Sequence, residues 1–296
     1  MMEKYLDMQG KVCVITGANA GIGKRAAFQL AQLGAKVIIV SRNEGSGKKA
    51  VEEISKETKN NHVYFFKGDL SYQASIKNLA NEIIAQWNEI NVLIHNAANF
   101  DLSMKQASLT EDRVETIFAT NHLGPVLLTN LLLDLLEKGK ARVITIASKG
   151  LLAYPLMRID FNNLNGEQSY SPTKAYYQSK LAQLMFTYKA AEVLKTKGIT
   201  INAIRVPSVQ LDEGRLEHVP ALMRKLYKVK RKFSITPEKM AETYVYLAAS
   251  PDLQHVTGKY FNEDNEIISS SKYSYNQVEI DRLWEYSNEL IQVEQW

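Results

Sequence analysis

The chain has 296 residues, of which 45% are apolar and 23% are charged, the composition of an ordinary globular protein. Its 36 Lys and Arg residues against 32 Asp and Glu residues give a net charge of +4, an excess too small and too dispersed to predict a nucleic-acid partner. The single cysteine, Cys13, excludes an intramolecular disulfide, and no apolar run reaches the roughly 18 residues of a membrane span, so we expect a soluble cytoplasmic protein.

Short apolar runs alternate with helical patterns along most of the chain. The runs are 12–15, 37–40, 63–66, 92–94, 143–146 and 199–204, and 256–261 is a candidate edge strand. Continuous apolar strands separated by helices predict a parallel sheet covered on both faces, and right-handed crossovers make that sheet doubly wound. The expected fold is therefore a Rossmann-type α/β fold with a mostly parallel, seven-stranded sheet.

The sequence contains no internal repeat, long linker or composition break. We therefore predict a single domain over 1–296, with a core at 9–262 and a C-terminal extension at 263–296. A helical pattern at 278–293 is expected to close the chain.

Three glycines, Gly17, Gly21 and Gly23, follow the first apolar run and open a helical pattern. Glycine lets the backbone turn tightly and approach a pyrophosphate, whose charge is met by the N-terminal amides of the helix. The motif therefore indicates a dinucleotide site, and the alternative is a turn that merely needs positive φ.

The second strand is followed by Ser41 and Arg42, where NAD sites place an acidic residue for the adenine ribose. A guanidinium there can meet a 2′-phosphate instead, which favours NADP(H) over NAD(H). A solvated loop charge is the other interpretation of Arg42, and NAD(H) stays an alternative.

A hydroxyl N-cap at Ser171 and a first-turn Pro172 predict the start of a long helix. On it, Tyr176 and Lys180 are four residues apart and share a face, and an ammonium beside a phenol lowers the phenol's pKa toward neutrality. Tyr177 lies three residues from Lys180, so spacing alone does not choose between the two tyrosines. A surface lysine whose stem packs on an aromatic ring is the alternative interpretation.

With the glycine loop near its start and Tyr176-x-x-x-Lys180 downstream, the chain resembles the short-chain dehydrogenase/reductase superfamily over nearly all of its length. Further motifs in the family's order are Gly68-Asp69-Leu70, His95-Asn96-Ala97-Ala98, Asn121-His122-Leu123-Gly124 and Ile146-Ala147-Ser148. Within the superfamily the chain is most similar to the retinol dehydrogenase branch. That similarity lies in Asn121-His122-Leu123-Gly124, in 175–182, in 256–261 and in Leu283-Trp284-Glu285.

The resemblance implies a catalytic set and the role of each member. Tyr176, rather than Tyr177, would give or take a proton, and Lys180 would lower its pKa and hold the nicotinamide ribose. Ser148 would hydrogen-bond the substrate oxygen, and Asn121 would hold a water that links Lys180 to solvent. The residues implied in cofactor binding are Gly17, Asn19, Gly21, Ile22, Gly23, Arg42, Asp69, Leu70, Asn96, Ala97, Tyr176, Lys180, Pro207 and Val209.

The implied activity is an NADP(H)-dependent interconversion of an alcohol and a carbonyl on a small lipophilic substrate. Family members commonly pair through the helices that hold Asn121 and Tyr176, so the resemblance also implies a homodimer or homotetramer.

Three departures from the family pattern lie near the expected nicotinamide side. Ala98 replaces a glycine, His95 replaces an asparagine, and Ser208 follows Pro207 where the family has a glycine. The family's next threonine is also absent, with Leu211 and Asp212 in that region. These departures motivate a second hypothesis, a cofactor-binding regulator or scaffold with little or no turnover.

Other polar features predict less. The five histidines show no ligand spacing, so we expect no metal site. The basic run at 223–233 falls where the family has its substrate lid. We interpret it as a solvated helix face, and lining an apolar pocket or contact with an anionic membrane surface is the alternative.

Overall fold

A central β-sheet organises the computed structural model, which describes residues 6–101, 103–210, 234–292 and 296. Its strands are β1 (Val12–Thr16), β2 (Lys36–Ser41), β3 (Val63–Lys67), β4 (Val92–His95), β5 (Arg142–Ser148), β6 (Thr200–Val206), β7 (Tyr260–Phe261) and β8 (Ile267–Ile268). They lie in the order β3-β2-β1-β4-β5-β6-β7-β8, and all neighbours pair in parallel except β7 with β8. The basic run at 223–233 and the departures at Leu211 and Asp212 lie outside the described residues.

The predicted doubly wound, mostly parallel sheet is confirmed, with one addition. The sheet has eight strands rather than seven, because the chain turns back after β7 and adds the two-residue antiparallel strand β8. The apolar run at 256–261 predicted a longer edge strand than the two residues that pair as β7.

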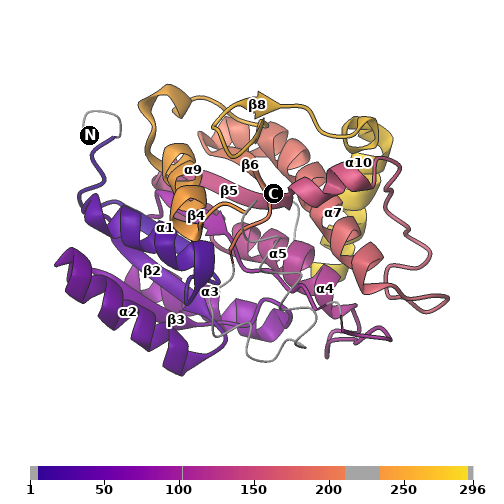
Figure 1. Ribbon diagram of the computed structural model, residues 1–296, viewed down its shortest axis with the longest axis horizontal. Coiled ribbons are helices and arrows are strands. Elements are labelled where there is room, and N and C mark those ends of the chain that lie inside the picture. The colour runs from indigo at the N-terminus through magenta and orange to yellow at the C-terminus, as the bar shows by residue number, and fades with distance from the viewer. Residues whose placement is uncertain (1–5, 102, 211–233, 293–295) are drawn as a thin grey trace.

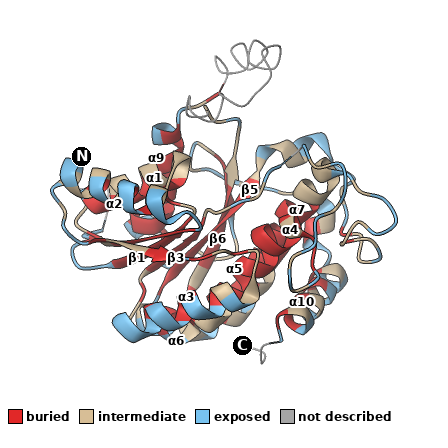
Figure 2. Ribbon diagram, turned by 90° about the horizontal axis from the view of Figure 1, so that it is seen from below, coloured by how far each residue is buried: buried red, intermediate tan, exposed pale blue. Residues whose placement is uncertain are grey.

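Helices cover both faces of the sheet (Figures 1 and 2). One layer holds α1 (Gly21–Gln32), α2 (Glu44–Thr58) and α9 (Pro237–Ala249). The other holds α3 (Gln73–Gln86), α4 (Thr116–Phe118), α5 (Gly124–Leu131), α6 (Leu133–Lys138), α7 (Pro172–Leu194) and α10 (Gln277–Ile291).

Alternate residues of each strand feed two separate cores, as the pleat requires. On β1, Val12 and Val14 pack into the layer of α5 and α7, whereas Cys13 and Ile15 pack into the layer of α1 and α9. Burial raises the pKa of the Cys13 thiol to about 12, so Cys13 is an inert core residue.

The apolar segment between β4 and β5 is not one straight helix. A π-helical turn, Ala119–Leu123, joins α4 to α5, and a second break separates α5 from α6. No single helix in the described part of the chain is long and apolar enough to cross a membrane, although the bent pair Thr116–Leu131 and Leu133–Gly139, broken by 67°, could by length and composition alone.

Gly124, the first residue of α5, sets how closely this helix approaches the loop after β3. A Cβ there would run into the carbonyl oxygen of Leu70 and lie 2.9 Å from the Cβ of Leu70. We expect Gly124→Ala to lower the free energy of unfolding by about 1–3 kcal/mol, because backbone cannot yield cheaply. Gly45→Ala, whose Cβ would meet only the Asn43 side chain at 3.5 Å, should be neutral or stabilising by up to about 1 kcal/mol. Denaturant unfolding of both variants tests this, and equal stabilities would contradict it.

Candidate active site

A cleft of about 390 Å³ opens at the carboxyl edge of the sheet, where the strand order reverses between β1 and β4. Open α/β sheets bind ligands at this kind of switch point. Of the residues expected to contact a cofactor, those that line the cleft are Gly17, Asn19, Gly21, Ile22, Gly23, Arg42, Asp69, Leu70, Asn96, Ala97 and Val209. Pro207, Tyr176 and Lys180 are not among the lining residues.

The glycine loop packs closely against the segment after β4. Gly17 has φ +67°, and a Cβ there would lie 2.8 Å from the Cα of Ala97. A Cβ on Gly23 would collide with the side-chain amide of Asn96. Helix α1 begins at Gly21, and its N-cap, Ala20, offers no capping side chain. Gly21, Ile22 and Gly23 of its first turn line the cleft, so their backbone amides are available to an anion there.

Asn96 holds this loop against β4. Its Nδ2 donates to the carbonyls of Thr16, at 2.9 Å, and Gly17, at 3.1 Å. Its Oδ1 accepts from the Tyr244 hydroxyl at 3.2 Å. Tyr244 is fully buried on α9, 148 residues away in the chain, and sequence reasoning missed it because a tyrosine on an apolar helix face predicts only core packing.

Arg42 stands just beyond the end of β2, at the rim of the cleft, with its side chain 67% exposed. Its Nη1 lies 4.0 Å from the Asp69 carboxylate. Such a long, solvated ion pair contributes little, so the guanidinium stays available to an anion in the cleft.

The four expected catalytic residues gather beside this cleft, on three elements. Ser148 ends β5, Asn121 lies in the π-helical turn, and Tyr176 and Lys180 lie on α7, which begins at Pro172 with Ser171 as its N-cap, as predicted. The Lys180 Nζ donates to the Ile146 carbonyl at 2.9 Å and lies 5.8 Å from the centroid of the Tyr176 ring.

Asn121 connects the cleft to α7. Its Nδ2 donates to Asn99 O and to Ser179 Oγ, both at 3.0 Å, and its Oδ1 accepts from the Asn99 amide at 2.6 Å. Ser179 in turn donates to the backbone carbonyl of Tyr176 at 2.7 Å. Asn99 lines the cleft, so the Asn121 side chain connects the cleft wall to α7.

The structure separates the two adjacent tyrosines that spacing could not. Tyr176 has Ser148 as its polar side-chain neighbour, and although burial raises the pKa of Tyr176, its interaction with Ser148 acts in the opposite direction. The Tyr177 ring instead packs on Tyr154, with centroids 4.5 Å apart, and covers Gly150, where a Cβ would lie 2.6 Å from the ring. Tyr177 therefore packs on the loop after Ser148, against Tyr154 and Gly150.

The pKa values differ from the sequence expectation. Burial, with the neighbouring Tyr177, raises the pKa of Tyr176 to about 12, and burial lowers the pKa of Lys180 to about 7. The predicted lowering by Lys180 is absent because its ammonium bonds to Ile146 rather than to the phenol oxygen. Helical spacing predicted that Tyr176 and Lys180 lie close together, but it could not predict how deeply they are buried. Burial disfavours both the phenolate of Tyr176 and the ammonium of Lys180.

Phe100, in the loop after β4, lies on the Tyr176 ring, with centroids 4.2 Å apart and planes tilted by 56°. The Phe100 side chain is itself 53% exposed. It covers one face of Tyr176 and adds to the burial that raises the pKa of the phenol.

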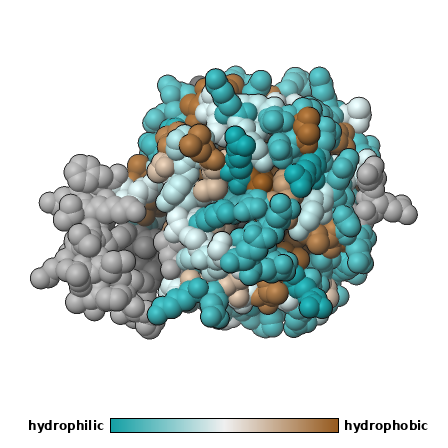
Figure 3. Space-filling model, turned by 90° about the vertical axis from the view of Figure 1, so that its right-hand side faces the viewer, coloured by the Kyte–Doolittle hydropathy of each residue, from teal (hydrophilic) through white to brown (hydrophobic). Residues whose placement is uncertain are grey.

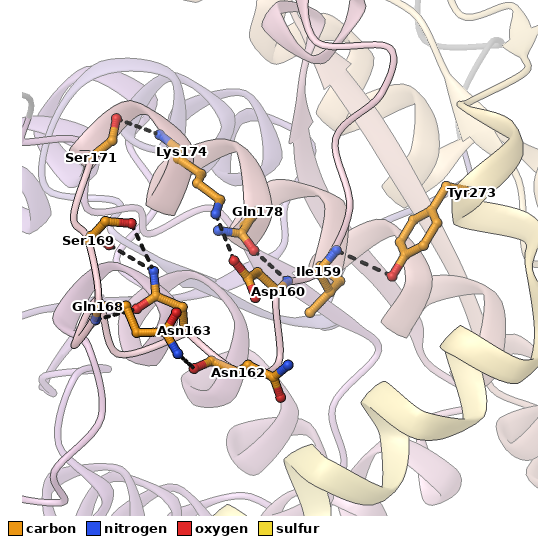
Figure 4. Close-up of polar contacts among 10 residues, drawn as sticks. All are labelled: Ile159, Asp160, Asn162, Asn163, Gln168, Ser169, Ser171, Lys174, Gln178 and Tyr273. Carbon is orange, nitrogen blue, oxygen red and sulfur yellow. Dashed lines mark hydrogen bonds and ion pairs between the residues drawn. The ribbon is translucent and has the colours of Figure 1, made fainter.

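A long loop from Tyr154 to Ser171 leads into α7 and packs against its first turns (Figure 4), and at the start of the loop Tyr154 contacts Tyr177. Gln178 accepts from the Asp160 amide at 2.7 Å, and Lys174 pairs with the Asp160 carboxylate at 2.8 Å. Farther along, the Ile159 amide donates to the Tyr273 hydroxyl at 3.3 Å. The loop is thus fixed both to the first turns of α7 and to the C-terminal segment.

The departures from the family pattern have identifiable surroundings. His95 is fully buried, and its Nε2 lies 2.7 Å from Thr129 Oγ1. The Thr129 hydroxyl donates to the Pro125 carbonyl, so His95 is the donor between the two, and burial lowers its pKa to about 3. Ala98 lines the cleft, and the Ser208 hydroxyl is 2.8 Å from that of Ser234.

Comparison with known proteins identifies the family. The family described as short chain dehydrogenase matches residues 11–213. The chain is a short-chain dehydrogenase.

Its relatives include Retinol dehydrogenase 12 of Mus musculus, 38% identical over 98% of this chain and 89% of that protein. Retinol dehydrogenase 11 of Mus musculus is 36% identical over 97% of this chain and 88% of that protein. The chain is thus an oxidoreductase of the short-chain dehydrogenase family that is similar to retinol dehydrogenases.

Solved structures agree on the fold. An uncharacterised protein from Mycobacterium Paratuberculosis superposes with a TM-score of 0.74 at 27% identity, covering 99% of this chain and 98% of that one. A 3-oxoacyl (acyl-carrier-protein) reductase from Agrobacterium tumefaciens C58 with NADP bound gives a TM-score of 0.69 at 22% identity, covering 86% and 93%. At that identity the second likeness shows the fold alone.

The buried ammonium of Lys180 should make the stability of the chain depend on pH. Because its folded pKa is about 7, below the ordinary lysine value of 10.5, the unfolded chain binds a proton between these limits that the folded chain does not. Stability from this group therefore rises with pH above 7 and is lowest below pH 7. We expect Lys180→Met to raise the thermal midpoint at pH 7 and to remove this rise between pH 7 and 9.

Lys189→Met is the matched control, because Lys189 lies on the same helix but pairs with Asp281 at the surface, at 2.6 Å. This variant should keep the wild-type pH dependence. Parallel stability profiles for the wild type and Lys180→Met would contradict the prediction.

Proposed function

We propose that this short-chain dehydrogenase interconverts an alcohol and a carbonyl on a small lipophilic substrate with NADP(H), using Tyr176 as general acid and base. The observation that carries the proposal is the Tyr176 phenol, held beside the Ser148 side chain and over the buried Lys180. Relatives named retinol dehydrogenase, together with the exposed apolar side chains of Leu152 and Leu156 on the neighbouring loop, support a lipophilic substrate.

The cleft fits a dinucleotide at three independent points. The uncapped start of α1 offers backbone amides to a pyrophosphate, the backbone can approach closely at Gly17, and Arg42 supplies a cation at the end of β2. When bound, the cofactor supplies or takes the hydride.

In this proposal the chain's own groups manage the substrate oxygen and its proton. The Ser148 hydroxyl donates a hydrogen bond to the carbonyl oxygen, and the Tyr176 hydroxyl gives it a proton in reduction or takes one in oxidation. A phenol whose pKa is about 12 is protonated at neutral pH, which favours its use as the acid in carbonyl reduction. Lys180, with a pKa of about 7, can exchange a proton in that range, and Asn121 would hold the water that links it to solvent.

Tyr176→Phe tests the proton-transfer role. It removes only the hydroxyl, and we expect kcat for NADPH oxidation across a panel of aldehydes and ketones to fall by roughly 100-fold or more. Tyr177→Phe makes the same chemical change one residue on, where the ring packs on Tyr154, and should keep activity within a few-fold.

Equal rates for wild type and Tyr176→Phe would remove the assignment. If calorimetry showed tight NADPH binding while no substrate turned over in any of the three proteins, a cofactor-binding regulator would replace it.

Arg42→Ala tests the cofactor preference. Loss of a charge-assisted contact to the 2′-phosphate should weaken NADPH binding by roughly tenfold or more and leave NADH binding little changed. Lys48→Ala is the control, because Lys48 is exposed on α2 and pairs with Glu44 at 2.6 Å. Titration by cofactor fluorescence gives both dissociation constants, and an unchanged NADPH-to-NADH ratio in Arg42→Ala would argue against NADP(H) recognition by this residue.

Self-association stays a prediction from the family resemblance. Helix α10 packs along α7, so any pairing through the long helices would have to accommodate α10 on that side.

A further inference from the structure

The turn that carries Asn121 is irregular. Residues Ala119–Leu123 form a π-helical turn between α4 and α5, a geometry that is rare and concentrated at functional sites. The Asn121 amide meets Asn99 and Ser179, which lie outside the turn. The position of the turn therefore decides whether the amide can reach both partners.

The next residue, His122, makes such a contact with the C-terminal helix. Its Nε2 lies 2.7 Å from the Ser287 hydroxyl on α10, and Ser287 donates to the carbonyl of Leu283 at 2.7 Å. Because that hydroxyl proton is already used, His122 donates from Nε2. Burial lowers the pKa of His122 to about 3, so the bond joins two neutral groups at every working pH.

Aromatic rings enclose this bond on several sides. The Phe118 ring lies 4.9 Å from His122, and the Phe186 ring of α7 meets its edge at 6.3 Å. Phe186 is in turn stacked on Trp284 of α10 at 6.1 Å. With His122 1% exposed and Ser287 2% exposed, water does not compete for the bond.

Helix α10 does not contact the cleft. None of its residues lines the cleft in the described part of the chain, and its outward residues Arg282, Glu285 and Glu289 are exposed. The face of the molecule on the side of α7 and α10 is mostly hydrophilic, with apolar side chains in small separate patches (Figure 3). Any influence of α10 on the site therefore passes through its buried side, which contacts His122.

We propose that His122 and Ser287 are positioning residues for Asn121. Through them α10, the C-terminal helix, holds the π-helical turn in the register that aims the Asn121 amide at Asn99 and Ser179. This inference rests on the proposed role of Asn121 in turnover, but the geometry it invokes can be measured without turnover.

Hydrogen exchange on the full chain provides that measurement. The Asn99 amide donates to Asn121 Oδ1, so its exchange rate reports whether the Asn121 side chain is in place. We expect Ser287→Ala to raise exchange at Asn99 and over 119–123 by roughly tenfold, with exchange in β1 and α1 unchanged. Ser274→Ala is the matched control, because it also removes a fully buried hydroxyl. The Ser274 hydroxyl donates to the Ser271 carbonyl at 2.6 Å and does not contact the π-helical turn.

Steady-state kinetics and NADPH binding are measured on the same variants. Ser287→Ala should lower kcat by about the factor seen in exchange and leave the NADPH dissociation constant within twofold. Ser274→Ala should behave like the wild type. His122→Gln, whose amide keeps a donor, should exchange closer to wild type than His122→Leu.

Wild-type exchange at Asn99 in both Ser287→Ala and His122→Leu would overturn the proposal. Uniformly faster exchange that includes β1 and α1 would also overturn it, since that outcome means global destabilisation. If the wild type has no turnover, the proposed function fails, while exchange still decides the positioning role.

Discussion

The site depends on one buried hydrogen bond, from the Lys180 ammonium to the Ile146 carbonyl. A fully buried lysine is costly, and the cost appears as a pKa lowered to about 7. The bond fixes α7 against β5 two residues before Ser148, so it brings the strand end and the helix that carries Tyr176 into register. The cost in stability and the arrangement of the site thus have the same origin.

Two asparagines join the nucleotide cleft to this arrangement. Asn96 ties the glycine loop to the end of β4, and Asn121 ties the loop after β4 to α7 through Asn99 and Ser179. The segment from Asn96 to Asn99 is common to both, so four residues of backbone connect the two sets of hydrogen bonds. An added methyl at Ala98 lies within this segment without interrupting either amide's hydrogen bonds.

The sequence predicted what depends on local pattern. Continuous apolar runs located the first six strands, and Ser171 with Pro172 located the start of α7, because burial and capping leave residue-level signals. It could not predict the π-helical turn, since apolar residues around it obscure any period, or the bond from Tyr244 to Asn96, which joins positions 148 residues apart. The predicted shift in the pKa of Tyr176 was wrong in direction for a related reason. Spacing shows which groups are near each other but not how much water they lose on burial.

The segment that carries Asn121 is held on both sides by the same kind of bond. His95 on β4 donates to Thr129, and His122 donates to Ser287, and in each case the hydroxyl is itself bonded to a carbonyl four residues earlier in its helix. Both imidazoles are buried, and burial lowers the pKa of each to about 3, so neither bond is lost by protonation near neutral pH. His95, which stands where the family has an asparagine, therefore gives α5 a neutral anchor to the sheet, close in sequence to the turn that carries Asn121.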